Sequence, residues 1–104
     1  EPRMLHLYTE PQAADAVAGV WRAADAERAW VMTRDEAIAA GVFGSVRPTV
    51  ADRIGDVLVA ARARVAYYDN RLDDRSPQRM VGQHGSLTLK ESVVPLLRAG
   101  AYAV

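Results

Sequence analysis

The chain has 104 residues, of which 50% are hydrophobic and 25% charged, and its formal net charge is zero. This length and composition are typical of one globular domain and exclude an intrinsically disordered chain. A neutral chain has no overall field that attracts nucleic acid or an anionic membrane. The absence of cysteine excludes disulfides, thiol catalysis and cysteine-ligated zinc.

No apolar run approaches the about 18 residues that a membrane-spanning helix needs, and the N-terminus lacks the order of charges and apolar residues found in a signal peptide. We therefore expect no membrane partner, with the cytoplasm as the default compartment. The chain starts at Glu1 rather than at a methionine. We interpret residues 1–104 as a single domain that forms the C-terminal part of a longer protein.

The first elements are predicted from apolar runs and capping patterns. Residues 4–8 form an apolar run typical of a buried strand. Thr9 and Gln12 have the spacing of a capping box, which predicts that a helix starts there. Its core-facing side, anchored by Trp21, is expected to comprise residues at helical spacing: Ala13, Val17, Val20, Trp21 and Ala24.

A second strand and a short helix follow in the same way. Residues 29–32 are predicted to form a strand, and Thr33 and Glu36 repeat the capping-box spacing. This pattern predicts a two-turn helix that ends at Gly41. Residues 48–53 are predicted to form one further helical turn.

Residues 56–60 form a nearly continuous apolar run, which is typical of a strand buried on both faces. Residues 65–68 are its predicted antiparallel partner in a β-hairpin. Thr88 and Glu91 predict one more helical turn, and residues 93–97 a final strand. Together these elements indicate an α/β or α+β fold, with a mixed sheet and covering helices.

The segment Gly82-Gln83-His84-Gly85-Ser86-Leu87-Thr88 is the candidate functional site. Glycine permits backbone conformations that can direct the His84 imidazole out of a tight turn into a cleft. The alternative is a solvent-exposed turn residue, since one histidine does not complete a metal site. The second histidine, His6, lies within an apolar strand pattern, which favours a hydrogen-bonded structural role.

Other chemistry is less well supported by the residue pattern. Ser86 and Thr88 lie too close to His84 in sequence to form a catalytic triad with it, and no glycine-rich phosphate loop is present. No two of the possible metal ligands have a recognised ligand spacing; they are His6, His84 and the carboxylates of Asp56, Asp69, Asp73 and Asp74.

Residues 62–79 contain five arginines and three aspartates, a balance of +2, next to Tyr67 and Tyr68. The mixture favours an exposed, salt-bridged loop over residues 69–78, and no nucleic-acid partner is expected. A phosphate- or nucleotide-binding module that uses these arginines stays open as an alternative: Arg62, Arg64, Arg71, Arg75 and Arg79.

Nearly the whole chain resembles the C-terminal portion of bacterial proteins of the alkaline phosphatase superfamily, in the type I phosphodiesterase and nucleotide pyrophosphatase branch. The matching blocks occur in the same order as in that family. They are Leu5-His6-Leu7-Tyr8 with Glu10-Pro11, Arg28-Ala29-Trp30-Val31-Met32-Thr33-Arg34-Asp35-Glu36-Ala37, Ile54-Gly55-Asp56-Val57-Leu58-Val59-Ala60-Ala61, Gly82-Gln83-His84-Gly85-Ser86-Leu87-Thr88 and Val94-Pro95-Leu96-Leu97.

The resemblance implies that the chain forms part of an alkaline-phosphatase-like fold. The whole protein would be a hydrolase of phosphoric diesters or pyrophosphates that uses two metal ions, usually zinc. His84 would be the last metal ligand, while the nucleophile and the other ligands would lie upstream of this chain. The implied partners are the remainder of the parent catalytic domain and a phosphate-ester substrate, and the isolated chain is expected to be inactive. Leu89 and Lys90 depart from the family, which often has proline after the threonine.

An alternative from another class is a non-catalytic interaction or dimerisation domain. A sheet with open edges favours such a role, because unpaired strand edges are covered when two copies associate. We therefore keep a homodimer as the second expectation for this chain.

Overall fold

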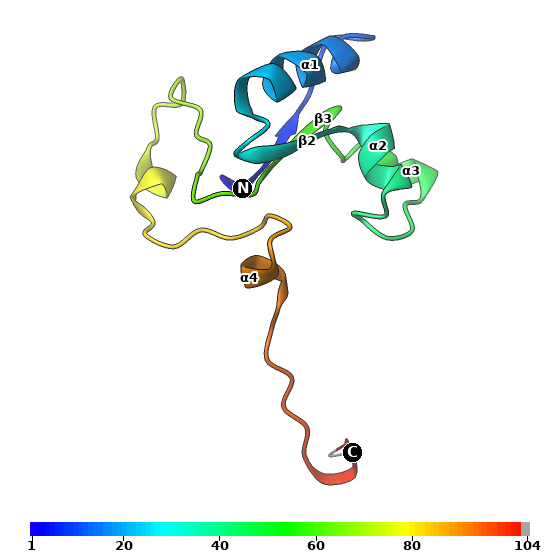
Figure 1. Cartoon of the computed structure of the whole chain (residues 1–104), viewed down its shortest axis with the longest axis vertical. Helices are drawn as coiled ribbons and strands as arrows, with labels where there is room; N and C mark the ends of the chain where they lie inside the picture. The colour runs from blue at the N-terminus through cyan, green and yellow to red at the C-terminus, as the bar shows by residue number, and fades with distance from the viewer. Residues whose placement is uncertain (103–104) are drawn as a thin grey trace.

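The computed structural model describes residues 1–102, which form an α+β structure around a small open sheet (Figure 1). No helix in this range has both the length and the apolar character needed to cross a membrane. In chain order the elements are β1 (Met4–Leu7), α1 (Ala14–Asp25), β2 (Ala29–Thr33), α2 (Arg34–Ala39), α3 (Pro48–Ala51), β3 (Val57–Ala61), the 3₁₀ turn η1 (Ser76–Arg79), α4 (Leu89–Ser92) and the 3₁₀ turn η2 (Gly100–Tyr102).

The sheet has the strand order β1-β3-β2, and both pairings are antiparallel. Leu5 of β1 and Val31 of β2 therefore lie on opposite sides of Val59 in β3. The expectation of a mixed sheet was wrong, because β1 and β2 run in the same direction but are separated by β3. Both outer strands are edge strands of the sheet formed by residues 1–102.

The central strand accounts for most of the fully buried apolar surface. All five residues of β3 are buried. Val57 and Val59 pack with Ala18 of α1 on one face, while Leu58 packs with Ala37 of α2 on the other. A strand covered on both faces has no solvent side and so needs no polar alternation, which explains the apolar run.

The predicted hairpin between this strand and residues 65–68 was wrong. Both edges of β3 are already paired with β1 and β2. Residues 65–68 form no strand; the Tyr67 N–H instead donates to the Pro2 carbonyl at 2.8 Å. A short apolar run after a strand thus becomes a packed loop when the strand has no free edge.

Helix α1 begins later than predicted and turns a different face inward. Its N-cap is Ala13, with no side-chain cap, because the Thr9 N–H binds the Asp56 carboxylate at 2.9 Å and Gln12 adopts φ 65°. Val20 is 69% exposed, contrary to its predicted core position. Ala24 is also exposed, and the inward face comprises Ala14, Val17, Ala18, Trp21 and Asp25.

The predictions for α2 and α3 were confirmed. Thr33 Oγ1 accepts the Glu36 N–H at 3.3 Å, and the Glu36 carboxylate accepts the Thr33 N–H at 2.8 Å. Helix α2 ends just before Gly41, and Pro48 opens α3.

The C-terminal part follows the prediction only at α4. Residues 93–97 form no strand, and the chain from there to η2 runs away from the sheet as an extended tail (Figure 1). The radius of gyration is 16.4 Å, whereas a compact chain of this length has about 13 Å. The tail carries Val93, Val94, Leu96 and Leu97, each at least 70% exposed.

A buried valine in β3 and an exposed valine in α1 provide a matched test of this core. Val59→Ala is expected to lower the free energy of unfolding by about 2 to 3 kcal/mol, because a fully buried side chain loses two methyl groups and leaves a cavity. Val20→Ala, the same change at an exposed position, is expected to stay within about 0.5 kcal/mol of wild type. Urea unfolding measures both, and equal losses would contradict the assignment.

Candidate functional site

His84 lies in an exposed loop between η1 and α4. No other residue in the described part of the chain hydrogen-bonds to its imidazole. The next residue, Gly85, has φ 124°, and a Cβ atom there would lie 2.9 Å from the Glu1 carboxylate. Glycine at this position therefore lets the loop turn and pass close to the N-terminus.

The described residues do not surround His84 with further metal ligands. Within residues 1–102, no group of three histidine, aspartate or glutamate side chains could hold a metal ion. Three of the candidate carboxylates are engaged locally: Asp56 with Arg34 at 3.1 Å, Asp69 with Arg71 at 2.6 Å, and Asp74 with the Ser76 N–H at 2.9 Å. The structure therefore offers one exposed imidazole rather than an assembled metal centre.

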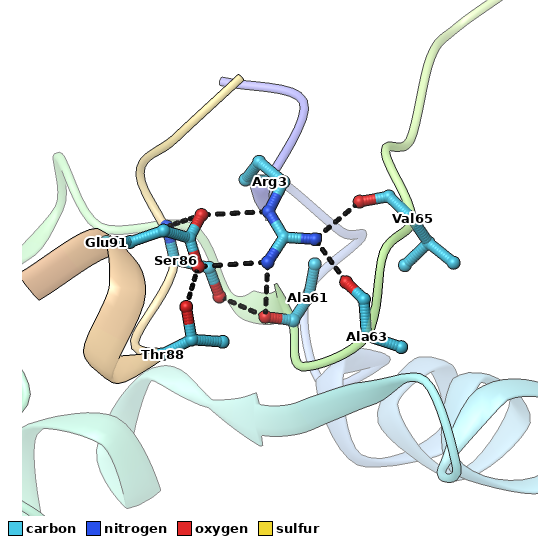
Figure 2. Close-up of polar contacts among 7 residues, drawn as sticks. All are labelled: Arg3, Ala61, Ala63, Val65, Ser86, Thr88 and Glu91. Carbon is cyan, nitrogen blue, oxygen red and sulfur yellow. Dashed lines mark hydrogen bonds and ion pairs between the residues drawn. The ribbon is translucent and has the colours of Figure 1, made fainter. Parts of the chain in front are cut away.

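A buried ion pair holds the base of the His84 loop (Figure 2). The Arg3 guanidinium donates from Nε and Nη2 to both oxygens of Glu91, at 2.8 and 2.9 Å. The same guanidinium donates to the carbonyls of Ala63 and Val65 at 2.5 and 2.6 Å. The side chains of Arg3 and Glu91 are only 11% and 8% exposed. The beginning of the chain, the segment after β3, and α4 are thus joined at one guanidinium.

Ser86 ties the loop itself to β3. Its buried hydroxyl donates to the Ala61 carbonyl at 2.5 Å, and its N–H donates to Glu91 at 3.3 Å. This hydroxyl is hydrogen-bonded to the backbone rather than to His84, so it forms no nucleophile–base pair here. Ser86 therefore fixes the loop two residues after His84.

Thr88 stands at the N-cap of α4, as predicted, but its hydrogen bonding differs from a capping box. Its hydroxyl donates to the Glu91 carboxylate instead of accepting the Glu91 N–H. Glu91 is oriented by Arg3, and its pKa is lowered to about 2, first by the Arg3 hydrogen bond and then also by those from Thr88 and Ser86. Burial raises the pKa of Glu91, but by less than the Arg3 hydrogen bond lowers it.

His6 has the structural role that the sequence favoured. Its Nδ1 accepts the Gly55 N–H at 3.0 Å. The two backbones approach so closely that a Cβ atom on Gly55 would lie 2.9 Å from the His6 backbone. Burial, followed by the positive N-terminus, lowers the pKa of His6 and favours the neutral imidazole that accepts this bond.

A second polar cluster joins the segment after β3 to α1. The Tyr67 hydroxyl donates to the carboxylate of Asp25, which also pairs with Arg28. Asp25 is 6% exposed, although the predicted core-facing side of the helix did not include it. Burial and Asp25 raise the pKa of Tyr67 to about 12. The Tyr67 ring also meets Trp21 edge-on, with 5.7 Å between centroids.

In the arginine-rich loop of residues 69–79, Arg71 and Arg75 bind residues of the loop itself. Arg71 donates to both oxygens of Asp69, and Arg75 to the Asn70 carbonyl at 3.2 Å. These contacts agree with the expected exposed, salt-bridged loop.

Comparisons with known proteins identify no relative: no family model matches the chain, and neither curated proteins nor solved structures include a match.

The buried ion pair predicts a pH-dependent stability. The pKa of Glu91 is about 2 in the folded protein, against its ordinary value of 4.5. A lowered folded-state pKa contributes stability above the unfolded-state value and loses it as the pH falls from there towards 2. Glu91→Gln is therefore expected to destabilise the protein at neutral pH by roughly 3 kcal/mol and to flatten this acid limb, as measured by denaturant unfolding between pH 7 and 2.

Asp69→Asn is the matched control for that experiment. Asp69 also has a pKa of about 2, set by its hydrogen bonds from Arg71. The Arg71 side chain in this pair is 90% exposed, and exposed ion pairs contribute little to stability. The stability of the Asp69→Asn variant at neutral pH should therefore stay close to that of the wild type. An equal loss in both variants would show that burial of the Arg3 pair has no special role.

Proposed function

We propose that this chain is the C-terminal part of a metal-dependent phosphodiesterase or nucleotide pyrophosphatase with an alkaline-phosphatase-like fold. In this proposal His84 supplies one ligand to a zinc ion or another divalent metal. The observation that carries the proposal is the exposed His84 imidazole, which follows the sequence pattern Gly82-Gln83-His84-Gly85 and has no hydrogen-bond partner among residues 1–102.

The attachment of the loop supports this role. A metal ligand has to be held within about 0.5 Å of its working position by its surroundings. Ser86 binds Ala61 and Glu91, while Arg3 binds Glu91 and two further carbonyls. The imidazole thus projects from a loop whose base is buried, and it stays accessible to a metal.

The chemistry requires more than this chain offers. In a two-metal phosphodiesterase the ions stabilise the attacking and leaving oxygens of the phosphate ester. One imidazole does not fix two ions, and the proposal places the nucleophile and the remaining ligands in the parent catalytic domain. The open edges of β1 and β2 support this division, since further strands of a larger sheet can pair there. The isolated chain should therefore be inactive.

Hydrolysis of a nitrophenyl phosphodiester with added zinc tests the proposal. The isolated chain should show no turnover, whereas a longer protein that includes the upstream part of the parent should be active. His84→Ala in the longer protein is expected to lower kcat/KM at least about 100-fold, because a metal ligand is lost.

His6→Gln is the control, because it changes the only other histidine of the chain and its side-chain oxygen can still accept the Gly55 N–H. This variant should remain close to wild type. Turnover by the isolated chain that disappears with His84→Ala, or full activity of the longer His84→Ala protein, would overturn the proposal.

A homodimerisation domain is the second candidate, and the exposed apolar tail favours it. Val94 and Leu97 are 74% and 94% exposed. Contiguous exposed apolar surface of this kind is often a protein interaction site. In a dimer, the tail of one copy would cover apolar surface of the other.

Sedimentation analysis of the purified chain tests the dimer. The double variant Val94→Asp/Leu97→Asp is expected to raise the dimer dissociation constant at least about tenfold, because charges would have to be buried in the interface. Leu72→Asp, at a position in the arginine-rich loop that is 61% exposed, should leave it unchanged. A wild-type chain that stays monomeric at millimolar concentration would exclude this candidate.

A further inference from the structure

A cavity of about 460 Å³ lies between the segment that follows β3 and the segment that carries His84. Residues 63–66 and Tyr68 line one side, and residues 80–83 with part of α4 line the other. This volume lies within the usual range for small-molecule sites, about 300 to 1,000 Å³. The Arg3–Glu91 pair lies at its wall, so one wall of the cavity is fixed by buried contacts.

The charges that line the cavity do not cancel. Three positive side chains and one negative side chain line it: Arg3, Arg64, Lys90 and Glu91. Arg3 and Glu91 neutralise each other through two hydrogen bonds. Arg64 and Lys90 form no ion pair with any residue in the described range. Two positive charges therefore remain, and they favour a ligand that carries two negative charges.

The uncharged lining adds an aromatic and apolar surface. Tyr68 is 36% exposed and Met80 is 62% exposed, so both present surface to a ligand. The Gln83 amide donates to the Pro77 carbonyl at 3.3 Å, which leaves its side-chain oxygen available as an acceptor. A tyrosine ring beside two cations suits a planar ring attached to an anionic group, because the ring can stack while the anion is paired.

We propose that this cavity binds a phosphate monoester that carries a planar ring, of the size of a nucleoside monophosphate. Arg64 and Lys90 bind the phosphate, whose charge at neutral pH is close to −2, and Tyr68 stacks on the ring. The site is distinct from the proposed metal ligand, because His84 does not line the cavity. Binding here needs no metal and does not rest on the proposed hydrolytic function.

Titration calorimetry of the full chain with adenosine monophosphate, in the presence of a metal chelator, tests this site. We expect a Kd below about 1 mM. Adenosine and inorganic phosphate should each bind at least about tenfold more weakly, since each keeps only one half of the recognised chemistry. Equal binding of inorganic phosphate and the nucleotide would overturn the role of the ring, and no binding of the nucleotide would overturn the site.

Three variants locate the binding site. Arg64→Gln and Lys90→Gln, at exposed positions outside the core, should each weaken nucleotide binding about tenfold through loss of a charge-assisted contact. Arg79→Gln removes an arginine from η1, which does not line the cavity, and should leave the Kd unchanged. Equal weakening in all three variants would indicate a diffuse charge effect and overturn the site.

His84→Ala separates this inference from the proposed function. The variant should bind the nucleotide like wild type in the chelator, even though it is expected to lower kcat/KM for hydrolysis at least about 100-fold in the longer protein. If His84→Ala abolished binding, the nucleotide would be held by the His84 loop rather than by the cavity, and the inference would be wrong.

Discussion

The Arg3 guanidinium is the point at which the parts of this chain meet. It lies in the turn just before β1, yet it binds Glu91 in α4 and the carbonyls of Ala63 and Val65 after β3. Arg3 also donates to the Ala61 carbonyl, 58 residues away, and its other partners lie still farther along the chain. Without these contacts, the loop that carries His84 would be attached to the sheet mainly through Ser86.

A buried ion pair of this kind contributes position more than stability. Removal of two charges from water costs several kcal/mol each, and their attraction offsets this only when the remaining hydrogen bonds are made. Here the Glu91 oxygens are satisfied by Arg3, Thr88 and Ser86. No buried side-chain polar atom in residues 1–102 lacks a partner. The pair therefore excludes other arrangements of the loop, which is what both a metal ligand and the wall of a cavity require.

The sequence was informative where the determinants are local. The Thr33–Glu36 capping box and the apolar run of β3 each depend on neighbouring residues, and both were predicted correctly. The prediction of the hairpin failed because strand pairing depends on which strand edges are free, and the free edges are known only once the whole sheet is known. The buried Asp25 was missed for the same reason, since its partner Tyr67 lies 42 residues away. For the site, the glycine pattern predicted the loop that carries His84, and the exposure of His84 agrees with the alternative of a solvent-exposed turn residue, whereas the Arg3–Glu91 anchor has no local signal.

The order of the strands has a consequence for synthesis on the ribosome. Within this chain β1 is synthesised well before β3, its only partner in the sheet formed by residues 1–102, and the register pairs Met4 with Ala60. Helix α1 and β2 also need β3 to form the buried surface between them. Residues 4–56 thus have to be synthesised before the sheet can close, and the last anchor waits for Glu91. Such high contact order slows folding and prolongs the exposure of apolar strands, so this domain should depend on chaperones more than its small size suggests.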